Sequence, residues 1–106
     1  MKTDAYIFFI HEIMPIMVLS EKMMDEILSY LEKSINNLAT DAFENLEIEG
    51  GFPGVESFLQ NQFDLRLENL LVAKKSGIHH LESGMKNKVI QRKQMIFEKI
   101  TQQYKN

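Results

Sequence analysis

The sequence of 106 residues predicts an all-α fold, a two-helix antiparallel hairpin that pairs into a helical bundle. Apolar residues recur at steps of three and four over two long stretches, a glycine-rich segment separates these stretches, and the two halves of the chain carry opposite charge. The length fits a single domain. We divide it into an apolar N-terminal segment (1–19), a first helix (20–49), a turn (50–54) and a second helix (55–104).

The first helix has a clear beginning and a clear end. Ser20 is a suitable N-cap, and Glu21 suits the positive end of the helix dipole. Apolar residues then follow at one-turn intervals, which predicts one buried stripe. The segment Gly-Gly-Phe-Pro-Gly at 50–54 ends the helix.

The second helix is predicted as one long element. At about 1.5 Å per residue it would be about 73 Å long against about 43 Å for the first helix. Its overhang must therefore be covered either by residues 5–19, folded as a kinked extension of the first helix, or by a partner. Gly77 and Gly84 lie seven residues apart. They either let a neighbouring helix approach closely or mark a local break. The predicted hairpin core comprises Leu31, Ile35, Leu38, Phe63, Leu67, Leu70, Leu81 and Met85.

Residues 5–19 are the most apolar stretch of the chain. The stretch is shorter than the roughly 20 apolar residues that span a bilayer. Because His11 and Glu12 interrupt it, we expect neither a signal peptide nor stable membrane insertion. Residues 6–10 can form a short strand or a helical turn, and Pro15 prevents a straight helix. Predicted partner-binding positions on this segment and on the overhang are Phe8, Phe9, Ile13, Met17, Val89, Ile96 and Ile100.

The charges are divided between the halves of the chain. Residues 1–50 carry three Lys/Arg and ten Asp/Glu, whereas residues 51–106 carry nine and five. The halves should attract each other when laid antiparallel, and exposed ion pairs select an orientation more than they stabilise it. We therefore expect the basic residues to pair with the first helix or face solvent, and we expect no nucleic-acid partner.

The sequence contains few groups that could support catalysis. It has no cysteine and no phosphate-binding glycine loop of the Gly-x-x-x-x-Gly-Lys-Ser/Thr type. His79 and Glu82 lie one helical turn apart, but zinc sites usually take three or four protein ligands. We therefore expect a non-enzyme without catalytic residues, metal or cofactor.

The turn Phe52-Pro53-Gly54, followed by residues 55–63 as the opening of a second helix, resembles that of the Trp-x-Gly (ESX-type) small proteins of type VII secretion, with Phe in place of Trp. The resemblance implies a non-enzymatic helical-hairpin dimer. A related group of that family consists of small helical partners that bind the N-terminal helical domains of LXG toxins. The export signal of that family, Tyr-x-x-x-Asp/Glu, is missing, because Tyr104 is followed only by Lys105 and Asn106. This implies a partner that borrows the signal of another chain.

We therefore predict a secretion partner or targeting chaperone that forms a hetero- or homodimer with a helical protein. Its expected location is the cytoplasm, with secretion alongside its partner as the second possibility. Two alternatives belong to other classes. One is an antitoxin-like or regulatory protein that neutralises its partner by occlusion, and the other is a self-assembling coiled-coil structural protein.

Overall fold

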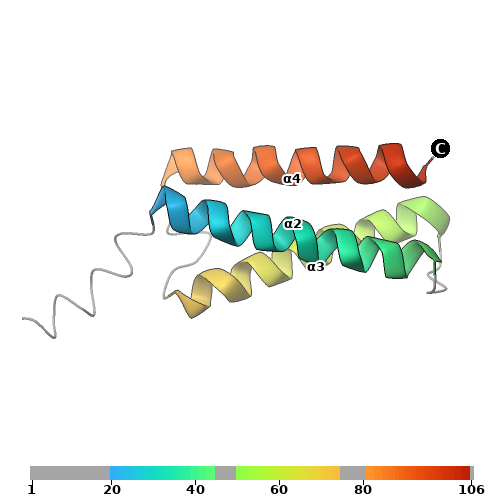
Figure 1. Cartoon of the computed structure of the whole chain (residues 1–106), viewed down its shortest axis with the longest axis horizontal. Coiled ribbons are helices and arrows are strands. Elements are labelled where there is room, and N and C mark those ends of the chain that lie inside the picture. Colours follow the sequence, from blue (N-terminus) through green and yellow to red (C-terminus); the bar gives the residue numbers. More distant parts are fainter. Residues whose placement is uncertain (1–19, 45–49, 75–80, 106) are drawn as a thin grey trace, which may run out of the picture.

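The computed structural model describes residues 20–44, 50–74 and 81–105, which form three α-helices and no strand. They are α2 (Glu21–Glu44), α3 (Gly51–Ala73) and α4 (Ser83–Tyr104). Figure 1 shows that α3 runs antiparallel to α2, whereas α4 runs in the same direction as α2. The all-α prediction is confirmed. The prediction of two helices is wrong, because a third helix, α4, packs on the hairpin of α2 and α3.

The predicted second helix is two helices. α3 ends at Ala73, where the N–H of Lys74 donates to the carbonyl oxygen of Leu71 over 3.0 Å. α4 begins at Ser83, and Gly84 lies in its first turn. A Cβ on Gly84 would meet nothing within 4 Å, so this glycine does not serve a close helix approach. Gly77 lies outside the described residues. With the chain reversed, α4 lies beside α2, and no overhang of the kind predicted remains (Figure 1).

The starts of α2 and α3 follow from local chemistry. Ser20 is the N-cap of α2, since its Oγ accepts a hydrogen bond from the N–H of Met23 over 3.2 Å. Gly50 and Gly51 have φ angles of +93° and +62°, which favour glycine. Residues 51–54, predicted as a turn, form the first turn of α3. Pro53 is tolerated there because the first N–H groups of a helix have no partner within it.

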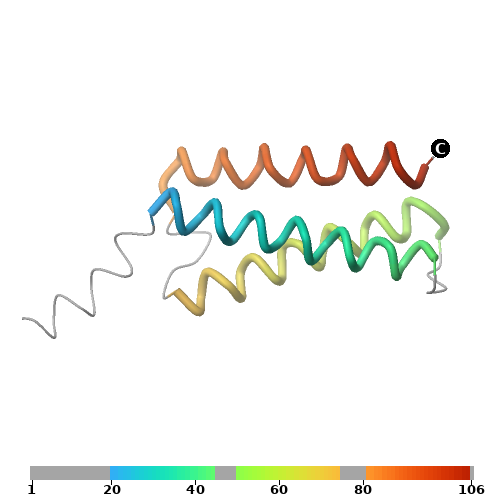
Figure 2. The backbone as a smooth tube through the Cα atoms, in the orientation of Figure 1, coloured from blue at the N-terminus to red at the C-terminus, as the bar shows by residue number. Residues whose placement is uncertain are grey.

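The core lies along α2, between α3 and α4. Buried residues on α3 recur every four positions, which traces a ridge inclined to the helix axis. Figure 2 shows α3 crossing α2 obliquely while α4 runs alongside α2. The buried side chains are Met24, Ile27, Leu28, Leu31, Ile35, Ala39, Ala42, Val55, Leu59, Phe63, Leu67, Leu71, Leu81, Ile96, Phe97 and Ile100.

The predicted core positions lie on this inner side of the bundle. The five that are buried are Leu31, Ile35, Phe63, Leu67 and Leu81. The three that are partly buried and pack against the core are Leu38, Leu70 and Met85.

The predicted partner-binding positions fall into two groups. Ile96 and Ile100 are buried in the bundle and Val89 packs against its core, so the prediction of an outward-facing overhang is wrong for all three. The physical reason is that α4 folds back and covers its own apolar stripe with α2 and α3. The other predicted positions, which lie outside the described residues, are Phe8, Phe9, Ile13 and Met17.

Opposite charges meet between α2 and α4. Lys88 Nζ lies 2.8 Å from Asp25 Oδ1, and Arg92 Nε lies 2.8 Å from Glu32 Oε1. Lys99 Nζ approaches the other oxygen of Glu32 at 3.9 Å. The hydrogen bond to Asp25 raises the pKa of the Lys88 ammonium above its ordinary value. The acidic and basic parts do attract, but these two helices are parallel and not antiparallel as predicted (Figure 1).

Matched leucines on α3 test the core assignment. Leu67 is 1% exposed and Leu65 is 56% exposed. Leu67→Ala should lower the free energy of unfolding by about 2–5 kcal/mol, because it leaves a cavity in the core. Leu65→Ala should change it by less than about 0.5 kcal/mol. Urea denaturation followed by circular dichroism measures both values, and equal losses would contradict the assignment of the buried face.

A double-mutant cycle tests the pairing of α4 with α2. Arg92→Gln and Glu32→Gln should show a coupling energy of about 0.5–1 kcal/mol, because the half-buried side chains form one ion pair. The coupling should shrink in about 1 M NaCl. Arg92→Gln combined with Glu26→Gln is the control, since Glu26 lies on the exposed side of α2. Similar coupling in both cycles would show that the pairing is not specific.

Candidate functional site

Ionisable side chains lie on the outside of the described bundle. No polar or charged residue within residues 20–44, 50–74 and 81–105 is buried. In the same ranges no three His, Cys, Asp or Glu side chains are grouped so that they could hold a metal ion. The three histidines, His11, His79 and His80, lie outside the described residues. The candidate site on the described surface is therefore a groove and not a cluster of ionisable groups.

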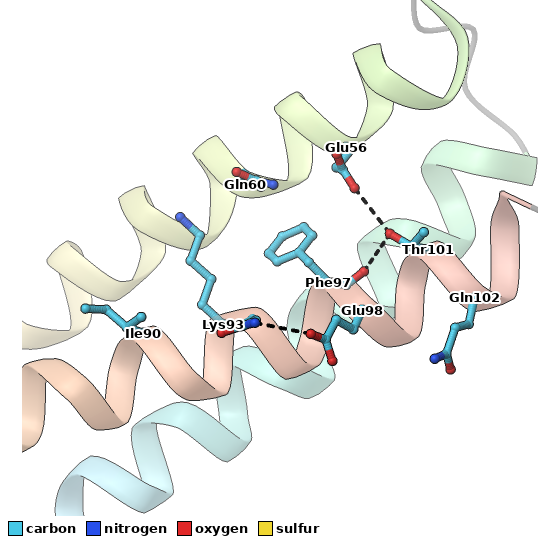
Figure 3. A pocket seen from close by; sticks show the side chains of 9 residues that line it. Glu56, Gln60, Ile90, Lys93, Phe97, Glu98, Thr101 and Gln102 are labelled. Carbon is cyan, nitrogen blue, oxygen red and sulfur yellow. Dashed lines mark hydrogen bonds between the residues drawn. The ribbon is translucent and has the colours of Figure 1, made fainter.

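A groove of about 670 Å³ lies between α3 and α4 (Figure 3). It forms because each of these helices packs mainly on α2 and only lightly on the other. The α3 side consists of Glu56 and Gln60, and the α4 side runs from Ile90 to Gln102. The groove is lined by Glu56, Gln60, Ile90, Lys93, Gln94, Phe97, Glu98, Thr101 and Gln102.

The floor of the groove is apolar. Phe97 points from α4 toward α3 and is only 7% exposed (Figure 3). Its ring meets the Phe63 ring edge to face, with 6.4 Å between centroids. Ile90 lies toward one end of the groove and is 61% exposed. Apolar surface therefore remains open to solvent between these two helices.

Polar contacts tie the rims of the groove together. Lys93 Nζ donates to Asp64 Oδ1 over 2.8 Å and lies 5.6 Å from the centre of the Phe63 ring. Thr101 Oγ1 lies 3.3 Å from Glu56 Oε2. These contacts bridge α4 to α3 and hold the apolar floor in place. An apolar floor with a few fixed polar groups at its rim is typical of a binding groove.

A second cluster closes the end of the bundle where α2 and α4 end and α3 begins. Phe43 stacks on Phe52 at 5.6 Å and on Tyr104 at 4.4 Å between ring centroids. The Tyr104 hydroxyl lies 3.1 Å from Thr40 Oγ1. Phe52, the aromatic residue of the predicted turn motif, thus packs against α2, while Pro53 and Gly54 continue the first turn of α3.

Several residues of these sites are absent from the sequence prediction. The groove residues Gln60, Ile90 and Phe97 become neighbours only when the predicted second helix folds back on itself. The glycines at 77 and 84 were the available signal for that fold-back, and they allowed two interpretations. Phe43 carried a weaker signal, as an aromatic residue near the end of a helix.

Variants at Tyr104 test whether its ring closes the end of the bundle. Tyr104→Phe should change the free energy of unfolding by less than about 0.5 kcal/mol, because the hydroxyl contact is exposed. Tyr104→Ala should lower it by about 1–3 kcal/mol, since it removes both the stacking and the buried area. Chemical denaturation measures both variants. An unchanged stability of Tyr104→Ala would show that the ring does not support the bundle.

Comparison with known proteins finds no matching family model, no matching curated protein and no matching solved structure. None of the three described helices is long and apolar enough to cross a membrane. The function is therefore argued from the geometry of the bundle and its groove.

Proposed function

We propose that the chain is a non-enzymatic binding protein that accepts an amphipathic helix of another protein in the groove between α3 and α4. The observation that carries this proposal is the apolar floor formed by Phe97 and the exposed Ile90 beside it. Two helices that diverge around such a floor offer the surface used in helix-in-groove recognition.

The dimensions of the groove suit a short helix. From Ile90 to Gln102 the α4 side extends over about 18 Å, or roughly three helical turns. A bound helix of that length presents two to four apolar anchors at steps of three and four. The groove is open to solvent on its outer side, which suits an elongated ligand better than an enclosed small molecule (Figure 3).

The ionisable groups of the groove support a binding role over a catalytic one. Lys93 is paired with Asp64, and Glu56 with Thr101. Glu98 accepts a hydrogen bond from Gln94 over 3.3 Å. General acid–base catalysis requires a titratable group within hydrogen-bond reach of the proton that it transfers. Here each of these three charged groups is engaged with a neighbouring side chain.

The biological setting that we propose for this binding rests on a resemblance in the sequence. The resemblance of residues 52–54 to the turn of type VII secretion proteins makes a helical domain of a secreted toxin, or of another secretion protein, the partner we propose. The chain would meet this partner in the cytoplasm and could leave the cell with it. The groove supports the proposal in one respect, namely that it suits a helical ligand.

Photocrosslinking from inside the groove tests this function. A photoreactive amino acid is placed at Gln94, which lines the groove, in cells that produce the protein. We expect a discrete adduct with one other protein, attached through a helical segment of that protein. The matched control carries the same amino acid at Asn61, which is exposed on α3 and lines no part of the groove.

Three outcomes would contradict the proposal in different ways. The same adducts from Gln94 and Asn61 would show unspecific contact. Attachment to the catalytic domain of a toxin would favour the antitoxin-like alternative. Adducts between copies of the chain alone would favour self-assembly.

A further inference from the structure

We propose that the helix accepted by the α3–α4 groove is a basic amphipathic helix, which places an arginine or a lysine between Glu56 and Glu98 and lays its apolar anchors over Ile90 and Phe97. The inference rests on the proposed function, because it names the kind of helix that the groove takes. It follows from the way in which the charged groups along the groove are paired.

Two carboxylates stand on opposite rims at one end of the groove. Glu56 belongs to α3 and lies beside Thr101, and Glu98 precedes Thr101 by one helical turn on α4. Figure 3 shows Glu56 and Glu98 on opposite sides of the Phe97 ring. A side chain that enters the groove over this ring therefore meets a carboxylate on each rim.

Neither carboxylate has a cationic partner among the residues that the structure describes. Glu56 Oε2 accepts from the Thr101 hydroxyl over 3.3 Å, and the same hydroxyl lies 2.9 Å from the Phe97 carbonyl oxygen. Glu98 Oε1 accepts from the Gln94 amide over 3.3 Å. Both donors are neutral, and both distances are long for a bond to an ionised group. Each contact leaves the second oxygen of its carboxylate able to accept a further bond.

Other carboxylates of the bundle are already paired with cations. Those that lie 2.8 Å from a Lys or Arg nitrogen of α4 are Asp25, Glu32 and Asp64. Because Lys93 is the partner of Asp64, the charge of this lysine on the groove is balanced within the chain. Lys105, which follows the last residue of α4, lies 5.8 Å from the centre of the Phe52 ring. The groove lining therefore offers a ligand two carboxylates that only neutral groups contact.

Arginine suits this end of the groove for two reasons. Its planar guanidinium donates in a fork to carboxylate oxygens, and such charge-assisted bonds are shorter and roughly twice as strong as neutral ones. Its long apolar stem can lie along the floor beside Phe97 while the charged head reaches the rims. Lysine supplies the charge without the fork.

The apolar floor sets where the anchors of the bound helix lie. Ile90 and Phe97 are seven residues apart on α4, about 10 Å along the axis, and Glu98 follows directly. The bound helix therefore presents apolar residues over about two turns and its cation toward Thr101. The net charge of −3 on the chain favours the approach of a basic partner.

Binding of two peptides to the full chain tests the inference. The probes are fluorescein-labelled helical peptides of about 14 residues, a length that matches the groove. Both carry three leucines at steps of four and three in a sequence of alanine and glutamine. One carries an arginine one turn beyond the last leucine, where the other carries glutamine. Fluorescence anisotropy measures both affinities at about 0.15 M salt, which screens exposed charges beyond about 8 Å.

We expect the arginine peptide to bind at least about fivefold more tightly than the glutamine peptide, because its guanidinium pairs with the two carboxylates. The variant Glu56→Gln with Glu98→Gln should lower this ratio by about the same factor. The control, Glu26→Gln with Asp41→Asn, removes as much charge from exposed positions of α2 and should keep the ratio. Because the helicity of each free peptide is the same for every variant, the change in ratio reports the carboxylates alone. Circular dichroism confirms that the variants fold like the parent chain.

A second pair of variants locates the peptide. Ile90→Ser should weaken the binding of both peptides by at least about fivefold, because it removes an apolar contact from the groove. Met95→Ser should leave both affinities unchanged, since Met95 is 52% exposed on α4 and lines no part of the groove. Both side chains are largely exposed, so neither substitution should unfold the bundle.

Four results would overturn the inference. Equal affinities of the two peptides for the parent chain would show that the groove does not select a cation. A ratio that survives Glu56→Gln with Glu98→Gln would show that other groups read the charge. Equal effects of Ile90→Ser and Met95→Ser would show binding outside the groove. Binding of neither peptide is the fourth. In every case a partner adduct from Gln94 would leave the proposed function standing, and the absence of that adduct would overturn it as well.

Discussion

Burial of the apolar face of α2 between α3 and α4 is the constraint on which the rest of the structure depends. α2 is buried along almost its whole length, from Met24 to Ala42. α3 and α4 each cover part of this face, and α3 crosses it obliquely because its buried residues recur every four positions. Because α4 runs alongside α2 while α3 crosses it obliquely, α3 and α4 diverge and pack only lightly on each other (Figure 2). The groove with Phe97 at its floor is thus a consequence of how α2 is covered.

Electrostatics then select how α4 is placed on this frame. α4 carries five Lys/Arg and one Glu, whereas α2 carries six Asp/Glu and two Lys. Lys88 and Arg92 reach α2, and Lys93 reaches Asp64 on α3. Parallel helices bring dipoles of the same direction together, which is mildly unfavourable, and the cross-helix ion pairs oppose that effect. Because the pairs are exposed or half-buried, each adds little to the free energy of unfolding, so they choose the orientation while apolar burial supplies the stability.

Local features of the fold were predictable from the sequence, and the path of the chain was not. Ser20 caps α2 as predicted, and the stripe through Leu31 and Ile35 is buried. A break after Ala73 was one of two interpretations of Gly77 and Gly84. Periodicity could not decide between them, because one apolar pattern can continue from the end of a helix into the start of the next. Because residues 55–104 were predicted as one helix, Ile96 and Ile100 were expected on an overhang that binds a partner. The groove depends on where three helices stand relative to one another, which no local pattern encodes.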